Sequence, residues 1–156
     1  MSTIVYREAR FPDDLRAVRD LFNEYAAAIG LNFCFQGFDE ELAGLPGKYA
    51  PPDGSLWLAA TADAFAGCVA MRPLEPGVCE LKRLYVRAEA RGAGIGRVLA
   101  NRVIEDARSA GYRVMRLDTL ASMEAARSLY RSLEFVERTP YYDNPIPNVV
   151  YMERDL

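Results

Sequence analysis

The sequence contains no histidine among its 156 residues. A serine or cysteine nucleophile that needs a histidine base is therefore excluded, and proton transfer near neutral pH falls to Glu, Asp, Tyr, Cys, Lys or a chain of waters. The three cysteines, Cys34, Cys68 and Cys79, are odd in number and form no CxxC pair. We therefore expect free thiols rather than a disulfide framework, and no metal site.

Long apolar runs are also missing. No stretch approaches the roughly 20 apolar residues of a membrane-spanning helix, and the N-terminus is charged from Arg7 onward with no apolar export signal. We expect a cytoplasmic protein with no membrane partner. The formal net charge of −3 gives no electrostatic support for nucleic-acid binding. The length, with 51% hydrophobic residues, fits a single domain over residues 1–156.

The hydrophobic pattern predicts an α/β protein. Apolar residues recur at helical spacing over 15–29, 95–107 and 123–133. Alternating or short apolar runs between turn residues predict the strands, which are 3–9, 55–62, 64–74, 78–87, 112–119, 135–138 and 149–155. Two stretches, 31–54 and 139–148, are irregular and rich in turn residues, and loops of such length are often functional.

One short segment, RGAGIG at residues 91–96, lies between a predicted strand and a predicted helix. The backbone N–H groups at such a helix start point outward, and the helix dipole favours an anion there. Glycines at alternate positions let the chain approach a bulky anion closely, and flanking arginines add charge-assisted contacts. Residues 82–102 carry six basic side chains and one acidic side chain. The segment therefore predicts a diphosphate-binding turn.

Other phosphate motifs fit this turn less well. A P-loop requires Lys and Ser or Thr after its last glycine, where this chain has Arg97 and Val98. A dinucleotide-binding fingerprint requires a third glycine at Arg97, although Asp118 follows about where a ribose-binding acid would lie. A merely flexible turn is the third alternative, and it leaves three glycines and their entropic cost unexplained.

The turn and its surroundings resemble the GNAT superfamily of acyl-CoA-dependent N-acetyltransferases. Residues 91–96 match the family signature Arg/Gln-x-x-Gly-x-Gly/Ala, ELKRLYV at 80–86 resembles its central strand, and ARSLYRSLEF at 126–135 resembles its second motif. The resemblance implies a mixed, mostly antiparallel sheet of six to seven strands flanked by helices. Its two central parallel strands, here 78–87 and 112–119, would splay apart. It also makes a homodimer plausible.

The resemblance implies that acetyl-CoA is the acyl donor. Its diphosphate would bind the N–H groups of residues 92–97, and its pantetheine arm would pair with the backbone of residues 84–86. An N–H on the same strand would face the thioester oxygen. The cofactor-binding residues that follow from this comparison are Leu84, Tyr85, Val86, Arg91, Gly92, Ala93, Gly94, Ile95, Gly96 and Arg97.

Two residues correspond to catalytic positions of the family. Tyr130 matches the tyrosine that protonates the departing thiolate, and its alternative role is a core-facing aromatic residue. Glu80 is the candidate base, directly or through water, and its alternative role is a salt-bridged or surface acid. Met123 and Glu134 depart from the family pattern, which has asparagine and glycine there. If residue 134 must adopt a left-handed backbone conformation, a glutamate there bears a steric cost that glycine avoids.

The irregular stretches are where the family builds its acceptor site. Aromatic and acidic side chains there suit an ammonium or an amine-bearing ring. The alternative is that the aromatics fill the core and that Asp39 caps a short helix over 39–43 with the following acids in its first turn. The candidate substrate-binding residues are Phe33, Phe35, Glu40, Glu41, Tyr141 and Tyr142.

The sequence therefore predicts an N-acetyltransferase that acts on a primary amine, most simply a small molecule, by direct attack in a ternary complex. Two other functions stay open. One is a non-catalytic acyl-CoA sensor with the same fold, and the other is a peptide or protein N-acetyltransferase.

Overall fold

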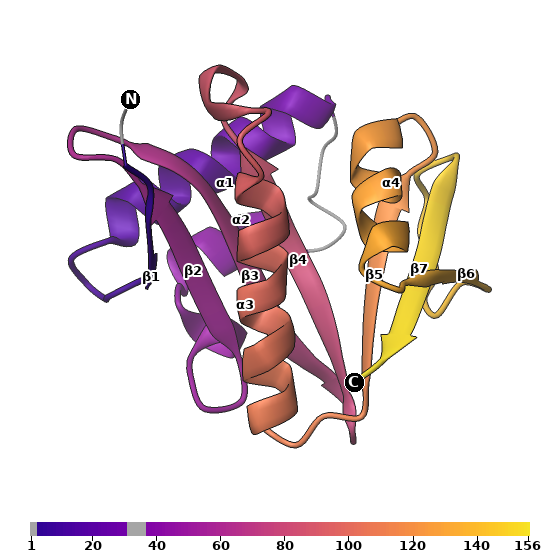
Figure 1. Cartoon of the computed structure of the whole chain (residues 1–156). Helices are drawn as coiled ribbons and strands as arrows, with labels where there is room; N and C mark the ends of the chain where they lie inside the picture. Colours follow the sequence, from indigo (N-terminus) through magenta and orange to yellow (C-terminus); the bar gives the residue numbers. More distant parts are fainter. Residues whose placement is uncertain (1–2, 31–36) are drawn as a thin grey trace.

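The structure, a computed structural model, describes residues 3–30 and 37–156. These residues form a seven-stranded sheet with helices on both faces (Figure 1). The strands are β1 (Val5–Glu8), β2 (Ser55–Ala60), β3 (Phe65–Glu75), β4 (Val78–Val86), β5 (Val114–Leu120), β6 (Val136–Arg138) and β7 (Val149–Asp155). The helices are α1 (Leu15–Ile29), α2 (Phe38–Ala43), α3 (Ile95–Ser109) and α4 (Glu124–Ser132), with short 3-10 turns η2 (Gly47–Tyr49) and η3 (Ala88–Ala90). None of these helices is long and apolar enough to cross a bilayer.

The sequence-based prediction of elements is confirmed in type and order, with ends that move by no more than two residues. The predicted strand 112–119 begins at Val114 instead of residue 112. At its start, the N–H groups of Arg113 and Val114 donate to the carbonyl of Gly77, which lies in the turn between β3 and β4. The predicted N-cap at Asp39 is wrong. The helix starts one residue earlier, with Gly37 in a left-handed conformation (φ 69°) at the cap, and Asp39 lies in the first turn.

The sheet has the strand order β1-β2-β3-β4-β5-β7-β6, and only the β4–β5 pair is parallel. That pairing comprises three residue pairs and ends at Glu80↔Arg116. Beyond it the two strands part toward the end of the sheet where α3 begins (Figure 1). We call the space between them, beyond Glu80 and Arg116, the fork. The predicted splayed parallel pair is therefore confirmed.

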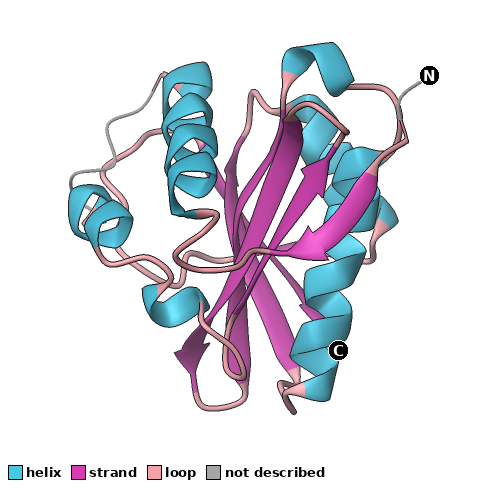
Figure 2. Cartoon of the chain, turned by 90° about the vertical axis from the view of Figure 1, so that its left-hand side faces the viewer, coloured by secondary structure: helices cyan, strands magenta, loops and turns pink. Residues whose placement is uncertain are grey.

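Two hydrophobic cores hold the layers together, one on each face of the twisted sheet (Figure 2). Leu99, Val103 and Ile104 of α3 pack on one face together with Tyr130 of α4. Leu21 and Phe22 of α1 pack on the other face. Because α3 is fixed along its whole length by this apolar stripe, its first turn is held rigidly at the mouth of the fork.

In the turn after α4, Glu134 adopts the backbone conformation for which the sequence predicted a steric cost. This residue adopts φ 72°, the left-handed region that glycine tolerates best. The steric cost for a side chain there is roughly 1–2 kcal/mol. A fold with a typical stability of about 5–15 kcal/mol can bear that cost. The turn forms in spite of the substitution, and Phe135 still reaches the core beside Tyr130.

Candidate active site

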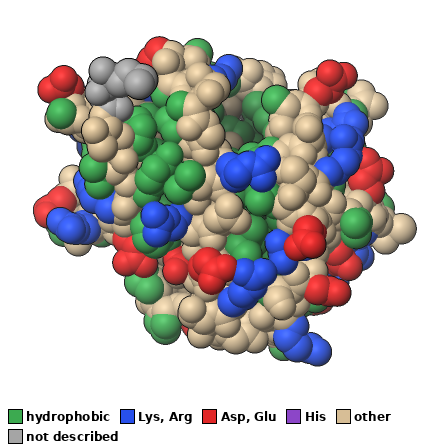
Figure 3. Space-filling view, viewed as in Figure 1, with side chains coloured by type: hydrophobic (Ala, Val, Ile, Leu, Met, Phe, Trp, Pro, Cys, Tyr) green, Lys and Arg blue, Asp and Glu red, His purple; other side chains and the backbone are tan. Residues whose placement is uncertain are grey.

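A large pocket of about 750 Å³ opens between the first turn of α3, the N-terminal half of α4 and the outer end of β4. In the space-filling view the surface is hollowed at this place, and apolar side chains line the hollow beside basic ones (Figure 3). Nine of the ten predicted cofactor-binding residues border the pocket, and Ala93 is the exception. The structure therefore brings together the segments 84–86 and 91–97, which the sequence could only place side by side along the chain.

The first turn of α3 has the geometry of an anion site. Gly92 and Gly94 adopt φ 89° and 77°, and Gly94 is the N-cap of the helix. The first hydrogen bond of the helix runs from Val98 N–H to the Gly94 carbonyl at 3.2 Å. The N–H groups of the three preceding residues have no acceptor within the helix, and the positive end of the helix dipole lies behind them.

A hypothetical Cβ atom tests how close a ligand can come to this turn. At Gly92 and Gly94 it would meet no atom within 4 Å, and at Gly96 it would meet Leu129 Cδ2 at 3.5 Å and Val86 Cγ2 at 3.8 Å. The glycines therefore leave the backbone uncovered on the pocket side. These features fit the diphosphate of a nucleotide-type cofactor.

Two arginines frame the turn. Arg91 donates from Nε to the Val86 carbonyl at 3.0 Å, which ties the turn to the end of β4. Arg97 donates from Nη2 to Ser132 Oγ at 2.8 Å and so spans from α3 to α4. Both guanidinium groups keep donors available for an anion, since each uses only one donor in these contacts.

A second, smaller cavity of about 40 Å³ lies in the fork itself, and we call it the fork cavity. It is bordered by Lys82 and Arg83 on β4 and by Asp118 and Thr119 on β5. It meets the large pocket at five residues that border both spaces, which are Tyr25, Ile29, Leu84, Met123 and Tyr130. The two spaces therefore adjoin at these residues, Tyr130 among them.

Tyr130 combines the two roles that the sequence left open. It is 6% exposed and packs edge-on against Phe135, with ring centroids 5.8 Å apart, so it belongs to the core. It also borders both the large pocket and the fork cavity. Burial raises the pKa of its phenol far above the ordinary value, and nearby negative charge adds to this effect. The hydroxyl is therefore protonated at any physiological pH.

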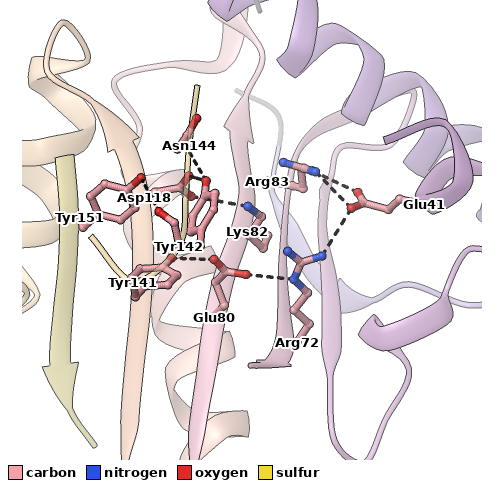
Figure 4. Close-up of polar contacts among 10 residues, drawn as sticks. All are labelled: Glu41, Arg72, Glu80, Lys82, Arg83, Asp118, Tyr141, Tyr142, Asn144 and Tyr151. Carbon is pink, nitrogen blue, oxygen red and sulfur yellow. Dashed lines mark hydrogen bonds and ion pairs between the residues drawn. The ribbon is translucent and has the colours of Figure 1, made fainter. Parts of the chain in front are cut away.

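Glu80 is buried inside a chain of charged and phenolic groups (Figure 4). Its carboxylate accepts hydrogen bonds from Arg72 Nε at 3.0 Å and from the Tyr141 hydroxyl at 2.6 Å. Glu80 borders neither the large pocket nor the fork cavity. The alternative of a salt-bridged acid thus describes its contacts, and any role as a base requires an intervening group.

Asp118 and Lys82 form a second part of this network, across the fork. Lys82 Nζ lies 3.5 Å from Asp118 Oδ1, and the Tyr142 hydroxyl donates to Asp118 Oδ2. Burial raises the pKa of Asp118, but the positive charge of Lys82 and the hydrogen bond from Tyr142 outweigh it. The pKa therefore lies below its ordinary value. Asp118 is a stable carboxylate at neutral pH.

The irregular 139–148 loop brings both predicted tyrosines to the fork (Figure 4). Tyr141, Tyr142 and Tyr151 form a cluster of rings with centroids 5.3–5.7 Å apart. Burial, and then the charge of Glu80, raise the pKa of Tyr141 well above its ordinary value; burial and Asp118 do the same for Tyr142. Both phenols stay protonated and hold the loop to the two strands by donating to their carboxylates.

The acidic side chains of α2 are not gathered into an open site for a cation. Both Glu41 oxygens accept hydrogen bonds at 3.1 Å from Arg83, whose side chain is 2% exposed. The charge of Glu41 is therefore already balanced. Glu40 is exposed on the helix surface. Phe33 and Phe35 lie outside the described residues.

Sequence reasoning missed Lys82 and Arg72 and considered Asp118 only for a different cofactor. One signal was available, because Lys82 and Asp118 each lie two residues beyond the last backbone pair of the two strands, Glu80↔Arg116. Reading it requires knowing that 78–87 and 112–119 are parallel neighbours. In the described part of the chain, no three His, Cys, Asp or Glu side chains are placed to hold a metal ion.

The sheet, the fork and the glycine turn together have the features of a site for a diphosphate-bearing cofactor. Comparison with known proteins identifies the class further. A sequence profile of the acetyltransferase (GNAT) family matches residues 15–135. The chain is 43% identical over 157 residues to an uncharacterized N-acetyltransferase of Schizosaccharomyces pombe, covering 99% of this chain and 96% of the relative.

Solved structures share the fold. A GNAT-family acetyltransferase of Staphylococcus aureus superposes with a TM-score of 0.81, at 18% identity and over 98% of this chain and 99% of that one. The acetyltransferase yncA of Salmonella typhimurium, solved with its cofactor acetyl-CoA, has a TM-score of 0.74, at 19% identity and over 97% and 93% of the two chains. The protein described here belongs to the acetyltransferase (GNAT) family and is an acyltransferase.

Proposed function

We propose that this protein transfers the acetyl group of acetyl-CoA to a primary amine of a small molecule, by direct attack within a ternary complex. One observation carries the proposal: the large pocket, which has the features of a cofactor site, adjoins the fork cavity, and Tyr130 borders both. A donor and an acceptor can therefore be bound at once and meet at this residue. No residue needs to carry the acyl group, because the amine can attack the thioester carbon directly.

When bound, acetyl-CoA supplies an activated acyl carbon on a thiolate leaving group. The N–H groups of residues 92–97 and the arginines beside them would hold its diphosphate. The outer end of β4 would hold its pantetheine arm, because beyond Glu80 that edge of β4 has no partner strand in the described fold. The strand also carries a bulge near Arg83 (φ 60°) that disturbs pairing with β3. A backbone N–H freed there would stabilise the negative charge that develops on the carbonyl oxygen.

The chain supplies the protons as follows. Tyr130, kept protonated by burial, would donate its hydroxyl proton to the sulfur as the C–S bond breaks. Glu80 would accept the proton that the amine loses as the C–N bond forms. Since Glu80 borders neither space, this proton would travel through water or through Tyr141, whose hydroxyl contacts it at 2.6 Å.

The direct test is the release of free thiol when the pure protein is mixed with acetyl-CoA and a panel of small primary amines. The protein's own thiols are subtracted with a reaction that lacks the amine. Amine-dependent release, with the acetylated amine found by mass spectrometry, supports the proposal. Binding of acetyl-CoA without release for any amine would identify a sensor instead, and release only with peptides would identify a peptide acetyltransferase.

A further inference from the structure

Lys82 is a buried cation whose hydrogen-bonding capacity is largely unused. Its side chain is 4% exposed, and its ion pair with Asp118 is 3.5 Å long. A charge-assisted hydrogen bond from an ammonium group to a carboxylate is normally about 2.7–2.9 Å long, and the group has three donors. Burying a charge is costly unless its donors find partners. Within the described residues, Lys82 therefore lacks acceptors for most of its donors.

Lys82 borders the fork cavity from β4, and a second side chain with a hydrogen-bond donor, Thr119, borders it from β5. Thr119 is 7% exposed and also borders the cavity. Its hydroxyl contact is to the thioether sulfur of Met123 at 3.7 Å, a weak acceptor. Because adjacent residues on a strand point to opposite faces, Thr119 and Asp118 approach the cavity from different sides of the sheet.

The carboxylates around the fork, in contrast, are already satisfied. Asp118 contacts Lys82 and accepts a hydrogen bond from Tyr142, Glu80 accepts from Arg72 and Tyr141, and Glu41 is bonded twice by Arg83. Among the side chains that border it, the cavity therefore has a surplus of donors rather than of acceptors. A ligand group that completes it must bring acceptor oxygens, and a carboxylate brings two of them on one carbon atom.

The size of the cavity limits this group. A volume of about 40 Å³ holds about three water positions, since each needs roughly 10–15 Å³. A carboxylate fits this space. The rest of such a ligand would extend toward Leu84, Met123 and Tyr130, where the cavity joins the large pocket.

We propose that the acceptor is an amine that also carries a carboxylate, with a small amino acid as the simplest case, and that Lys82 binds this carboxylate in the fork. This inference rests on the proposed function and names its substrate class. The carboxylate anchored at Lys82 places the amine on the side of Tyr130, where the acyl group of the donor would lie. Lys82 acts in this account as a specificity-determining residue and not in proton transfer.

The test compares three forms of the same acceptor: the amino acid, its primary amide and its decarboxylated amine. The pKa of the amine in the amino acid lies between the amine pKa values of the amide and of the decarboxylated amine. A preference for the amino acid over both therefore reports its carboxylate and not a difference in amine pKa. We expect kcat/KM to be at least about tenfold higher for the acid, which is the range of one hydrogen bond between charged groups. Equal or faster transfer to the neutral forms would overturn the inference while leaving acetyl transfer intact. Transfer to other amines of the panel but to none of the three would also overturn the inference, whereas transfer to no amine at all would overturn the proposed function.

Variants of Lys82 assign the effect to this residue. In Lys82→Met we expect kcat/KM for the acid to fall at least about tenfold, to the level of the amide, with values for the amide and the KM for acetyl-CoA within about twofold of the original. Lys82→Arg, which keeps the charge, should keep a preference for the acid. Lys48→Met, a change of an exposed lysine on η2, is the matched control and should alter nothing. An equal loss for acid and amide in Lys82→Met would show a structural role and contradict the inference. Thermal unfolding with and without acetyl-CoA checks that each variant is folded.

Discussion

Tyr130→Phe is expected to lower kcat for acetyl transfer by about 100-fold or more, the lower end of the usual range for loss of a general acid. The change removes one oxygen from a group whose pKa is raised by burial, so the protein loses a proton donor that is always protonated. The ring and its edge-on contact with Phe135 are retained. Steady-state kinetics should therefore show a loss in kcat, with the Kd for acetyl-CoA within about twofold of the original.

Tyr112→Phe is the matched control for this experiment. The Tyr112 hydroxyl makes one hydrogen bond, to the Asp53 carbonyl at 2.7 Å, and Tyr112 borders neither the large pocket nor the fork cavity. Its loss should leave kcat unchanged. If Tyr130→Phe kept full activity, Tyr130 would be a core residue only, and thiolate protonation would have to come from water.

Gly94→Val is expected to weaken acetyl-CoA binding by about 10- to 100-fold, the equivalent of losing one or two charge-assisted hydrogen bonds. Gly94 has φ 77°, which a β-branched residue avoids, so the turn must change shape and displace its N–H groups. The new side chain would also project into the open space on the pocket side. Isothermal titration with acetyl-CoA, on protein shown to be folded, measures the change.

Gly111→Val separates the loss of the binding site from backbone strain. Gly111 follows the C-terminal end of the same helix, has φ 91°, and a Cβ there would likewise meet nothing within 4 Å. Both variants carry a similar strain, but Gly111 does not border the large pocket. We expect both proteins to lose stability and only Gly94→Val to lose acetyl-CoA affinity. Equal affinities of the two variants for acetyl-CoA would show that the glycine turn is not part of the cofactor site.

Local patterns were sufficient to predict the elements and to select residues that border the large pocket. Helices α1 and α3 follow from their apolar spacing, and residues 91–97 are contiguous, so their chemistry is visible in the sequence itself. The left-handed conformation of Glu134 could also be anticipated, because a family position that holds glycine indicates a backbone constraint.

The acceptor half could not be predicted in the same way, because its contacts join residues that are distant in sequence. Glu41 pairs with Arg83 across 42 positions, and Tyr141 reaches Glu80 across 61. Which carboxylate meets which cation depends on where the β4–β5 pairing ends and where the 139–148 loop lies. The sequence suggested an acidic site for an ammonium group, whereas in the folded chain Glu41 is paired with Arg83 and Glu40 lies on the surface, and Lys82 retains unused donors.

The central claim is that the fork and the glycine turn form one site in which the donor meets the acceptor beside Tyr130. A crystal structure with acetyl-CoA bound tests it most directly. The account predicts the diphosphate against the N–H groups of residues 92–97, the pantetheine arm along residues 84–86, and the thioester within reach of the Tyr130 hydroxyl. A diphosphate bound away from α3, or a thioester that points away from the fork, would contradict it.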